Sequence, residues 1–280
     1  MEKEKSRMDY KRNRTGIAVL FLWCLLLCGC RELQGYRPIE DIHNLDGRRV
    51  GVGLGYSTDY LLTGRDDMAL MRYDSTADML MALRYRRVDA IAAERPTANQ
   101  IMSSTEGFRI VDPPLQENGF VAYVANGRED LCKKFNAFAS EFVETEEYED
   151  LKRRMNAPGV YEEKEVKATG NGETIRIVVV SDNYPYSYQN FETGEFAGSD
   201  IEYITYFANA YNYNLEIHGG DYNFMELGVV YEKFDMGISG LSDVWRADLE
   251  MTQKALVTDI YMDTDVVFVE VEDFDKLRIL

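Results

Sequence analysis

Short apolar runs alternate with amphipathic stretches along most of the chain. The runs are typical of buried strands, and they lie within 45–54, 69–73, 88–93, 108–111, 119–124, 175–180, 215–218, 236–238 and 265–271. Segments whose apolar residues have helical spacing lie between or after these runs, near 55–59 and at 75–84, 96–103, 131–142, 200–211 and 224–233. A loop is expected at 112–114, where two prolines stand together. This alternation predicts an α/β fold with parallel, doubly wound sheets.

Local signals add detail to three of these segments. Ser75 precedes a helical pattern and is a plausible N-cap, and the Ser and Thr within 55–59 are candidate caps of another helix. One helical face, made of Leu131, Phe135, Phe138, Ala139 and Phe142, indicates core packing, and Cys132 shares that setting. The segment 161–174 is charged and then glycine-rich, so a flexible linker is expected there.

The first residues indicate export. Positive charges at 11–14 precede an apolar run from Gly16 to Leu27, which is shorter than the roughly 20 residues that a membrane span needs. The following Leu27-Cys28-Gly29-Cys30 resembles a bacterial lipobox, which implies a signal peptide at 1–29, lipidation of Cys30 and a tether over 30–44. An ordinary signal peptide and an N-terminal anchor are the alternatives. The expected location is the periplasm or the cell surface.

Charge and cysteine usage exclude several classes of function. The chain has 31 Lys and Arg against 49 Asp and Glu, a net charge of −18, which disfavours nucleic acid as a partner. Three of the four cysteines lie in the export segment, and the two histidines, His43 and His218, stand far apart. No metal or other cofactor is therefore predicted.

The segment 235–246 carries the most informative chemistry. A short apolar strand runs into glycines and serines, and Arg246 follows, in the expected first turn of a helix. Small residues let a ligand approach the backbone, and a guanidinium matches a carboxylate. A surface turn with a solvated arginine is the alternative.

Several of these segments resemble one known family. The stretches 175–186, 198–202 and 234–242 together with Arg246 resemble lobe 1 of the bacterial extracellular solute-binding proteins of family 3, the polar amino-acid binding components of ABC importers. The stretches 45–52, 55–58 and 88–96 look like lobe 2 of that family, and 119–155 is similar to its closing strand and C-terminal helices. The resemblance implies two Rossmann-like lobes of the type II flytrap fold.

The order of these segments differs from that of the family. Lobe 2 comes first, at 45–118, followed by the closing segment of lobe 1 at 119–160, the linker at 161–174 and the rest of lobe 1 at 175–280. This order predicts a circular permutant, a monomer in which one covalent connection, near 111–124, joins the lobes. The rival hypothesis is two half-proteins in series, completed by a partner chain.

Site residues are carried over from the resemblance position by position. It implies that Arg246 binds a carboxylate, helped by the Ser242 hydroxyl, the Gly240 backbone and, from lobe 2, Ser57 and Thr58. Glu94 falls at the position that holds an ammonium group, where the family commonly has aspartate. The aromatic positions that would contact a ligand are Tyr184, Tyr186 and Tyr222, with Phe224 as an alternative to Tyr222.

The resemblance implies a lipid-anchored binding protein that holds a small zwitterion, such as an amino acid, for an ABC permease. A flytrap module that senses a ligand for a membrane signalling partner is the second hypothesis. An enzyme on this fold, related to a dehydratase or a murein lyase, is the third; it needs a general acid, for which only Glu94 or Asp243 stands out. The expectation is binding without catalysis.

Overall fold

The computed structural model describes residues 38–104, 106–244, 254–273 and 277. Residues 39–280 form one compact unit, and every element named here belongs to it. The signal segment, Cys30 and Arg246 lie outside the described residues. Among the helices that the structure describes, none is long and apolar enough to cross a membrane.

Helices and strands alternate as the hydrophobic pattern predicts. The first part contains β1 (Arg48–Gly53), α2 (Ser57–Leu62), β2 (Met68–Tyr73), α3 (Thr76–Arg84), β3 (Ala90–Glu94), α4 (Arg95–Ser104) and β4 (Phe108–Ala125). Two helices follow, α5 (Glu129–Phe142) and α6 (Glu146–Asn156). The rest contains β5 (Thr174–Val180), β6 (Asp182–Asn183), β7 (Ser187–Gln189), β8 (Phe196–Ala197), α7 (Ser199–Ala210), β9 (Asn214–Gly220), α8 (Tyr222–Val230), β10 (Met236–Ser242), β11 (Ala255–Val257) and β12 (Met262–Val271).

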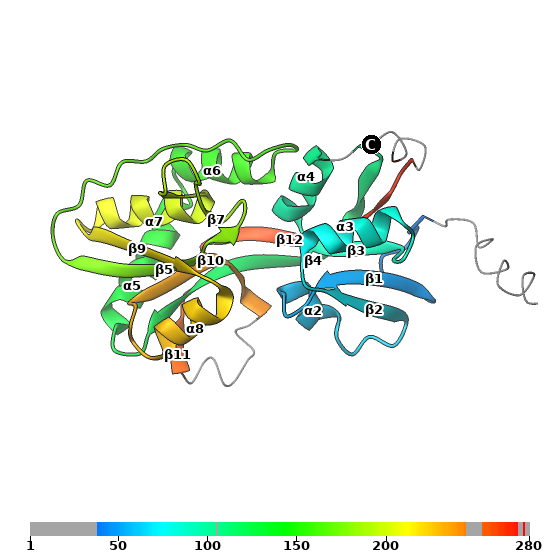
Figure 1. Ribbon diagram of the computed structural model, residues 1–280. Helices are drawn as coiled ribbons and strands as arrows, with labels where there is room; N and C mark the ends of the chain where they lie inside the picture. Colours follow the sequence, from blue (N-terminus) through cyan, green and yellow to red (C-terminus); the bar gives the residue numbers. More distant parts are fainter. Residues whose placement is uncertain (1–37, 105, 245–253, 274–276, 278–280) are drawn as a thin grey trace, which may run out of the picture. The chain divides into compact units, whose positions relative to one another are not determined.

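The main sheet consists of two halves with the same internal order (Figure 1). In one half β1 lies between β2 and β3 and is parallel to both, and β12 pairs antiparallel with β3. In the other half β5 lies between β9 and β10 and is parallel to both, and β4 pairs antiparallel with β10. We refer to the half around β1 as lobe 2 and to the half around β5 as lobe 1. The predicted α/β class is confirmed.

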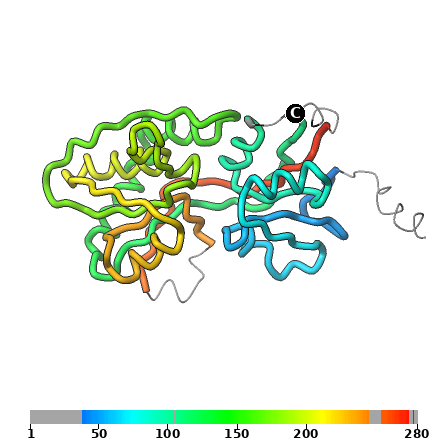
Figure 2. Tube along the Cα trace, in the orientation of Figure 1, coloured from blue at the N-terminus to red at the C-terminus, as the bar shows by residue number. Residues whose placement is uncertain are grey.

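Two antiparallel strands connect the lobes. β4 is an 18-residue strand that contains both prolines, so the loop expected at 112–114 is wrong; the pairing with β12 shifts register there, between Val111 and Gln116. β12 pairs with β4 from Met262 opposite Phe120 to Val271 opposite Phe108, and the two run side by side in Figure 2. The sequence predicts a single covalent connection between lobes, but β12 provides a second one.

The described start of the chain packs on lobe 2. The sequence predicts a tether over 30–44, but Ile39, Ile42 and Leu45 are buried in the lobe 2 core together with Val50 and Phe268. The Ile39 backbone N–H donates to the Glu270 carboxylate at 2.8 Å. Apolar burial and this long-range hydrogen bond therefore fix residues from 39 onward to the folded unit.

The segment 157–173 joins α6 to β5 without helix or strand. The sequence predicts a flexible linker at 161–174, but hydrogen bonds hold this segment along α7. The Asn209 side chain donates to the Lys167 carbonyl at 2.9 Å and accepts from the Thr169 N–H at 2.7 Å. Further on, the Gly172 N–H donates to the Asn212 carbonyl at 2.9 Å. The segment is a pinned connector.

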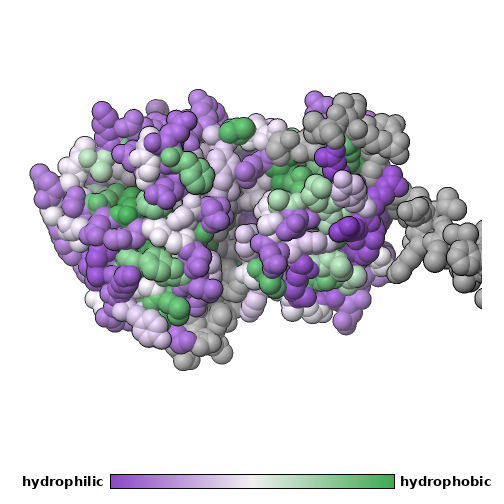
Figure 3. Space-filling model, in the orientation of Figure 1, coloured by the Kyte–Doolittle hydropathy of each residue, from purple (hydrophilic) through white to green (hydrophobic). Residues whose placement is uncertain are grey.

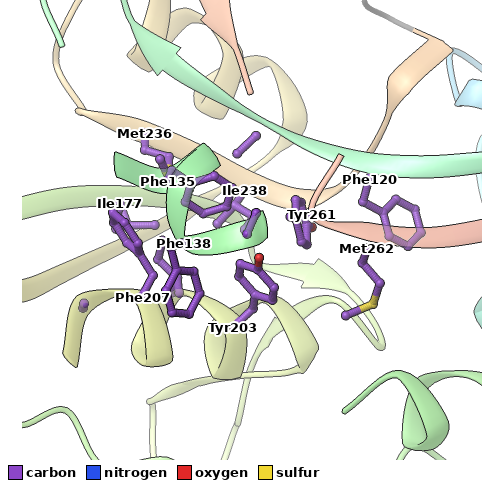
Figure 4. Close-up of a cluster of buried hydrophobic side chains, with 14 of the residues drawn as sticks. Phe120, Phe135, Phe138, Ile177, Tyr203, Phe207, Met236, Ile238, Tyr261 and Met262 are labelled. Atoms are coloured by element: carbon purple, nitrogen blue, oxygen red, sulfur yellow. The ribbon is translucent and has the colours of Figure 1, made fainter. Parts of the chain in front are cut away.

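An aromatic core fills lobe 1 (Figure 4). The predicted stripe on α5 is confirmed: all five residues named for it are buried, and Cys132 packs against them, partly buried. Phe135 and Phe138 meet Phe207 of α7 with ring centroids 5.3 and 5.6 Å apart. Because both helices bury aromatic rings, they are held firmly against the strands that carry the candidate site.

Candidate functional site

A pocket of about 1070 Å³ lies where the carboxyl ends of the parallel strands of both lobes meet. Residues at or just after the ends of β1 and β3 of lobe 2 line it, as do residues at or just after the ends of β5, β9 and β10 of lobe 1. Figure 3 shows the hollow between the two halves. Open α/β sheets bind ligands at this edge, so the topology alone makes this pocket the leading candidate site.

Eight of the nine ligand-binding residues predicted from the sequence line this pocket: Ser57, Thr58, Glu94, Tyr184, Tyr186, Tyr222, Gly240 and Ser242. The ninth, Arg246, lies outside the described residues. Ser242 and Lys254, which stand on either side of the undescribed segment 245–253, both line the pocket. The alternative to Tyr222, Phe224, is not among the lining residues; its ring packs on Phe234, with centroids 5.5 Å apart.

On the lobe 2 side, Ser57 and Glu94 act together. The Ser57 hydroxyl donates to the Glu94 carboxylate through a short hydrogen bond. Burial raises the pKa of Glu94, although the hydrogen bond from Ser57 partly opposes that effect. Neither Ser57 nor Thr58 caps α2, because the N-cap position belongs to Tyr56 and makes no side-chain bond. Their hydroxyls are thus placed in the first turn, at the pocket wall.

On the lobe 1 side, Gly240 lines the pocket and is held by Asp200. The Gly240 N–H donates to the Asp200 carboxylate at 2.5 Å, and the Tyr261 hydroxyl donates to its other oxygen at 2.7 Å. The backbone donor of Gly240, expected to bind a ligand carboxylate, is therefore engaged by Asp200. Gly240 has φ +58, and a Cβ there would lie 2.5 Å from the ring of Tyr186, so glycine is required for two reasons.

Asp200 is almost fully buried, at 1% exposure. Burial raises its pKa to about 7, with partial opposition from the hydrogen bonds of Tyr261 and Gly240. Asp200 is one of the residues that carry the family resemblance, but the sequence does not show that its side chain supports the pocket. Asp200 stands at a helix start and Gly240 is distant in the chain, so only the fold brings the two residues together.

The tyrosines of lobe 1 differ in their roles. Tyr186 is buried, and its ring meets that of Phe120 at 4.9 Å in an edge-on arrangement. Tyr184 is tied to the connector, since its hydroxyl accepts from the Tyr161 N–H at 2.7 Å. Both therefore present aromatic surface to the pocket from fixed positions.

Sequence reasoning missed several polar lining residues. Asp182 and Asn183 follow β5, and the Asn183 side chain donates to the Ser239 carbonyl at 2.8 Å. Asp221 is the N-cap of α8 and accepts from the Phe224 N–H, and Glu226 lies within that helix. Asp182, Asn183 and Asp221 follow parallel strands, a position that could have identified them had the strand order been known. Among the described residues, no group of three His, Cys, Asp or Glu is arranged to hold a metal ion.

No known protein-family model matches the chain, and no curated protein matches it. Solved structures do resemble it. The ancestral amino acid-binding protein AncCDT-1, a precursor of cyclohexadienyl dehydratase, is 12% identical over 84% of this chain and 86% of its own, with a TM-score of 0.42. A phosphate-binding protein of a phosphate ABC transporter from Streptococcus pneumoniae is 12% identical over 80% and 88%, with a TM-score of 0.40. The VFT2 domain of Bordetella pertussis BvgS, as a double mutant, is 11% identical over 82% of each chain, with a TM-score of 0.41. At these scores, none of the three identifies the function of this chain.

Proposed function

We propose that this chain is an extracytoplasmic solute-binding protein of the type II flytrap kind, similar to family 3, which binds a small zwitterion such as an amino acid. One observation carries the proposal: a pocket lies at the carboxyl ends of the parallel strands of two lobes and takes lining residues from both. A ligand that contacts both walls favours the closed arrangement of the lobes. The partner would be an ABC permease or, as the alternative, a membrane-bound sensor.

The strand order supports a circular permutation as part of this proposal. This one chain forms both halves of the sheet. Two half-proteins completed by a partner chain would instead leave sheet edges for the partner to cover. In this permutation, the pinned connector 157–173 would join the segments that form the C-terminus and the N-terminus in the family. The new ends would both fall in lobe 2, where Ile39 is bonded to Glu270 and Leu277 packs in the core. With both crossing strands retained, the hinge has two strands rather than one.

The energetics suit a small charged ligand. A hydrogen bond to a charged group contributes roughly 1.5–3 kcal/mol. Three or four such bonds, less the cost of ordering ligand and side chains, reach the roughly −8 kcal/mol of a micromolar site. The proposal assigns binding, and no catalytic step, to Glu94.

Calorimetry with a panel of amino acids tests the proposal, together with the variant Arg246→Ala. Loss of the guanidinium should weaken binding of a carboxylate-bearing ligand by about 2 kcal/mol or more, which is roughly 30-fold. Arg153→Ala is the control, because the Arg153 side chain is two-thirds exposed on α6 and does not line the pocket. Equal affinity in folded Arg246→Ala and wild type would remove Arg246 from the site, and no binding by any amino acid would refute the proposed ligand class.

The proposal includes lipid anchoring through Cys30. Cys30→Ser should release the protein from the membrane or stop its maturation, because the Cys30 thiol is the proposed attachment of the acyl chains. Fractionation and mass spectrometry of the mature N-terminus measure this. Cys132→Ser is the control and should stay membrane-bound. An unmodified N-terminus in the wild-type protein would rule out the anchor.

A further inference from the structure

The candidate pocket extends beyond the residues assigned to a zwitterion. Its volume of about 1070 Å³ is at the upper limit of the range of about 300–1,000 Å³ typical of pockets for drug-sized ligands, and an amino acid as small as alanine fills little of it. Part of the remaining wall comes from α3 and α4 of lobe 2. It includes Ala77, Leu80 and Met81 of α3 and Thr97, Gln100 and Ile101 of α4. We call the part of the pocket lined by these six residues the helix groove.

Helix α3 has apolar residues on two faces. Met79 and Leu83 are buried and belong to the face that packs on the lobe 2 core. Ala77, Leu80 and Met81 have the i, i+3, i+4 spacing of a second face, and all three line the pocket. Met81 is 46% exposed, which is high for a large apolar side chain. Exposed apolar residues that line a pocket are suited to bind an apolar part of a ligand.

Helix α4 supplies the rest of the helix groove. Thr97, Gln100 and Ile101 have the same helical spacing, so they share one face of α4. Both helices cover the same side of the lobe 2 sheet (Figure 1), and Met79 of α3 and Ile101 of α4 belong to one core cluster. Because α3 and α4 are both part of lobe 2, the helix groove does not depend on how the two lobes close.

The helix groove begins next to the proposed zwitterion site. α3 and α4 follow β2 and β3, which are parallel to β1, so the first turns of both helices lie at the carboxyl edge of the sheet. Glu94 is the last residue of β3, and α4 begins at the next residue. The side chain of Thr97 in α4 is hydrogen-bonded to that of Tyr186 in lobe 1. The start of α4 therefore contacts both walls of the pocket.

The helix groove leads away from that edge along α3. Arg84 is the last residue of α3, and its guanidinium donates to the Leu277 carbonyl at 2.5 Å, which fixes this end of the pocket wall. The helix rises about 10 Å from Ala77 to Arg84, at 1.5 Å per residue. This length suits an extended chain of several methylene groups.

We propose that the ligand of this pocket is an amino acid with a long apolar side chain, and that the helix groove binds this side chain. Its ammonium and carboxylate groups occupy the proposed zwitterion site, and the side chain lies along Leu80 and Met81. Because each methylene group buried against apolar side chains strengthens binding, the length of the side chain sets the affinity. This inference rests on the proposed function and specifies the class of side chain that the ligand carries.

Calorimetry with straight-chain amino acids, from alanine to α-aminooctanoate, tests the inference on the mature protein. Affinity should rise about twofold or more with each added methylene group, so α-aminooctanoate should bind at least about 30-fold more tightly than alanine. Lysine is norleucine with an ammonium group at the end of the side chain, and it should bind more weakly than norleucine. Equal affinities for alanine and α-aminooctanoate would overturn the inference, as would equal affinities for lysine and norleucine.

A matched pair of variants places the side chain in the helix groove. Met81→Gln nearly keeps the length of the side chain but makes it polar, so it should weaken binding of α-aminooctanoate about fivefold or more and leave alanine within about twofold. Met71→Gln is the control, because Met71 is 41% exposed on β2 and does not line the pocket. Equal losses in the two variants, or equal losses for the two ligands, would overturn the assignment of the helix groove.

This inference and the proposed function fail in different ways. If all the straight-chain amino acids bind with the same affinity, the zwitterion site stands and the helix groove is wrong. If octanoate, which lacks the ammonium group, binds as tightly as α-aminooctanoate while short amino acids do not bind, the helix groove stands and the zwitterion is wrong. If none of these probes binds to the folded protein, both proposals are wrong.

Discussion

Arg154→Met should lower the free energy of unfolding by about 3–5 kcal/mol, because it leaves a buried carboxylate without its partner. The Arg154 guanidinium donates to Glu202 of α7 at 2.6 Å, and both side chains are almost fully buried. Urea unfolding followed by circular dichroism measures the change.

The same guanidinium fixes the connector. It donates to the Tyr161 hydroxyl at 2.9 Å and to the Glu162 carbonyl at 2.8 Å, and the Tyr161 hydroxyl donates to Glu202 at 3.0 Å. One buried cation thus joins α6, α7 and the connector 157–173. We expect the variant to increase proteolytic cleavage within this connector at temperatures where the rest of the chain is folded.

Two further variants test whether the loss of stability comes from this ion pair or from the removal of any charge. Arg153→Met removes the neighbouring arginine, whose side chain is 66% exposed, and should change stability by no more than about 1 kcal/mol. The double variant Arg154→Met/Glu202→Met should recover part of the loss, since it leaves no unpaired charge. A small effect of Arg154→Met alone would contradict the role given to this pair.

Wild-type stability should fall by about 3 kcal/mol between pH 5 and pH 8 through Asp200, whose folded-state pKa is about 7 against an ordinary 3.8. Because the folded-state pKa is the higher one, the folded protein retains the proton over this window while the unfolded chain has lost it. The contribution is complete below the unfolded pKa and is lost as the pH rises through 7. Glu94, whose pKa burial also raises, contributes with the same sign.

Asp200→Asn isolates the effect. An amide resembles the protonated carboxyl: its oxygen can accept from Gly240 and its nitrogen can donate to Tyr261. The variant should therefore lose less stability between pH 5 and pH 8 than the wild type does. Asp259→Asn, at an exposed position, should follow the wild type. Parallel pH profiles for wild type and Asp200→Asn, measured by urea unfolding, would contradict the buried, protonated state.

The local pattern was sufficient to predict the elements and part of the site. Apolar periodicity placed most strands and helices, and Ser75 caps α3 as predicted. The family resemblance named pocket residues in both lobes, and several of them lie at or near the carboxyl end of a strand, the edge at which open α/β sheets bind ligands. Two prolines suggested a loop within β4, but β4 pairs with β12 on both sides of them, and the register of the pairing shifts at that point.

The sequence by itself determined the α/β class, the core face of α5 and the positions of Glu94 and Gly240 near the ends of their strands, since each depends on residues near in the chain. Only the tertiary structure decided what depends on distant partners. β12 crosses back to lobe 2 because its apolar residues pair with β3 and β4 more than 140 residues earlier. The 161–174 segment is pinned because Asn209 and Arg154 meet it, and Gly240 loses its free N–H because Asp200 accepts it. Such contacts depend on how the lobes pack, and the local periodicity of the sequence carries no information about that packing.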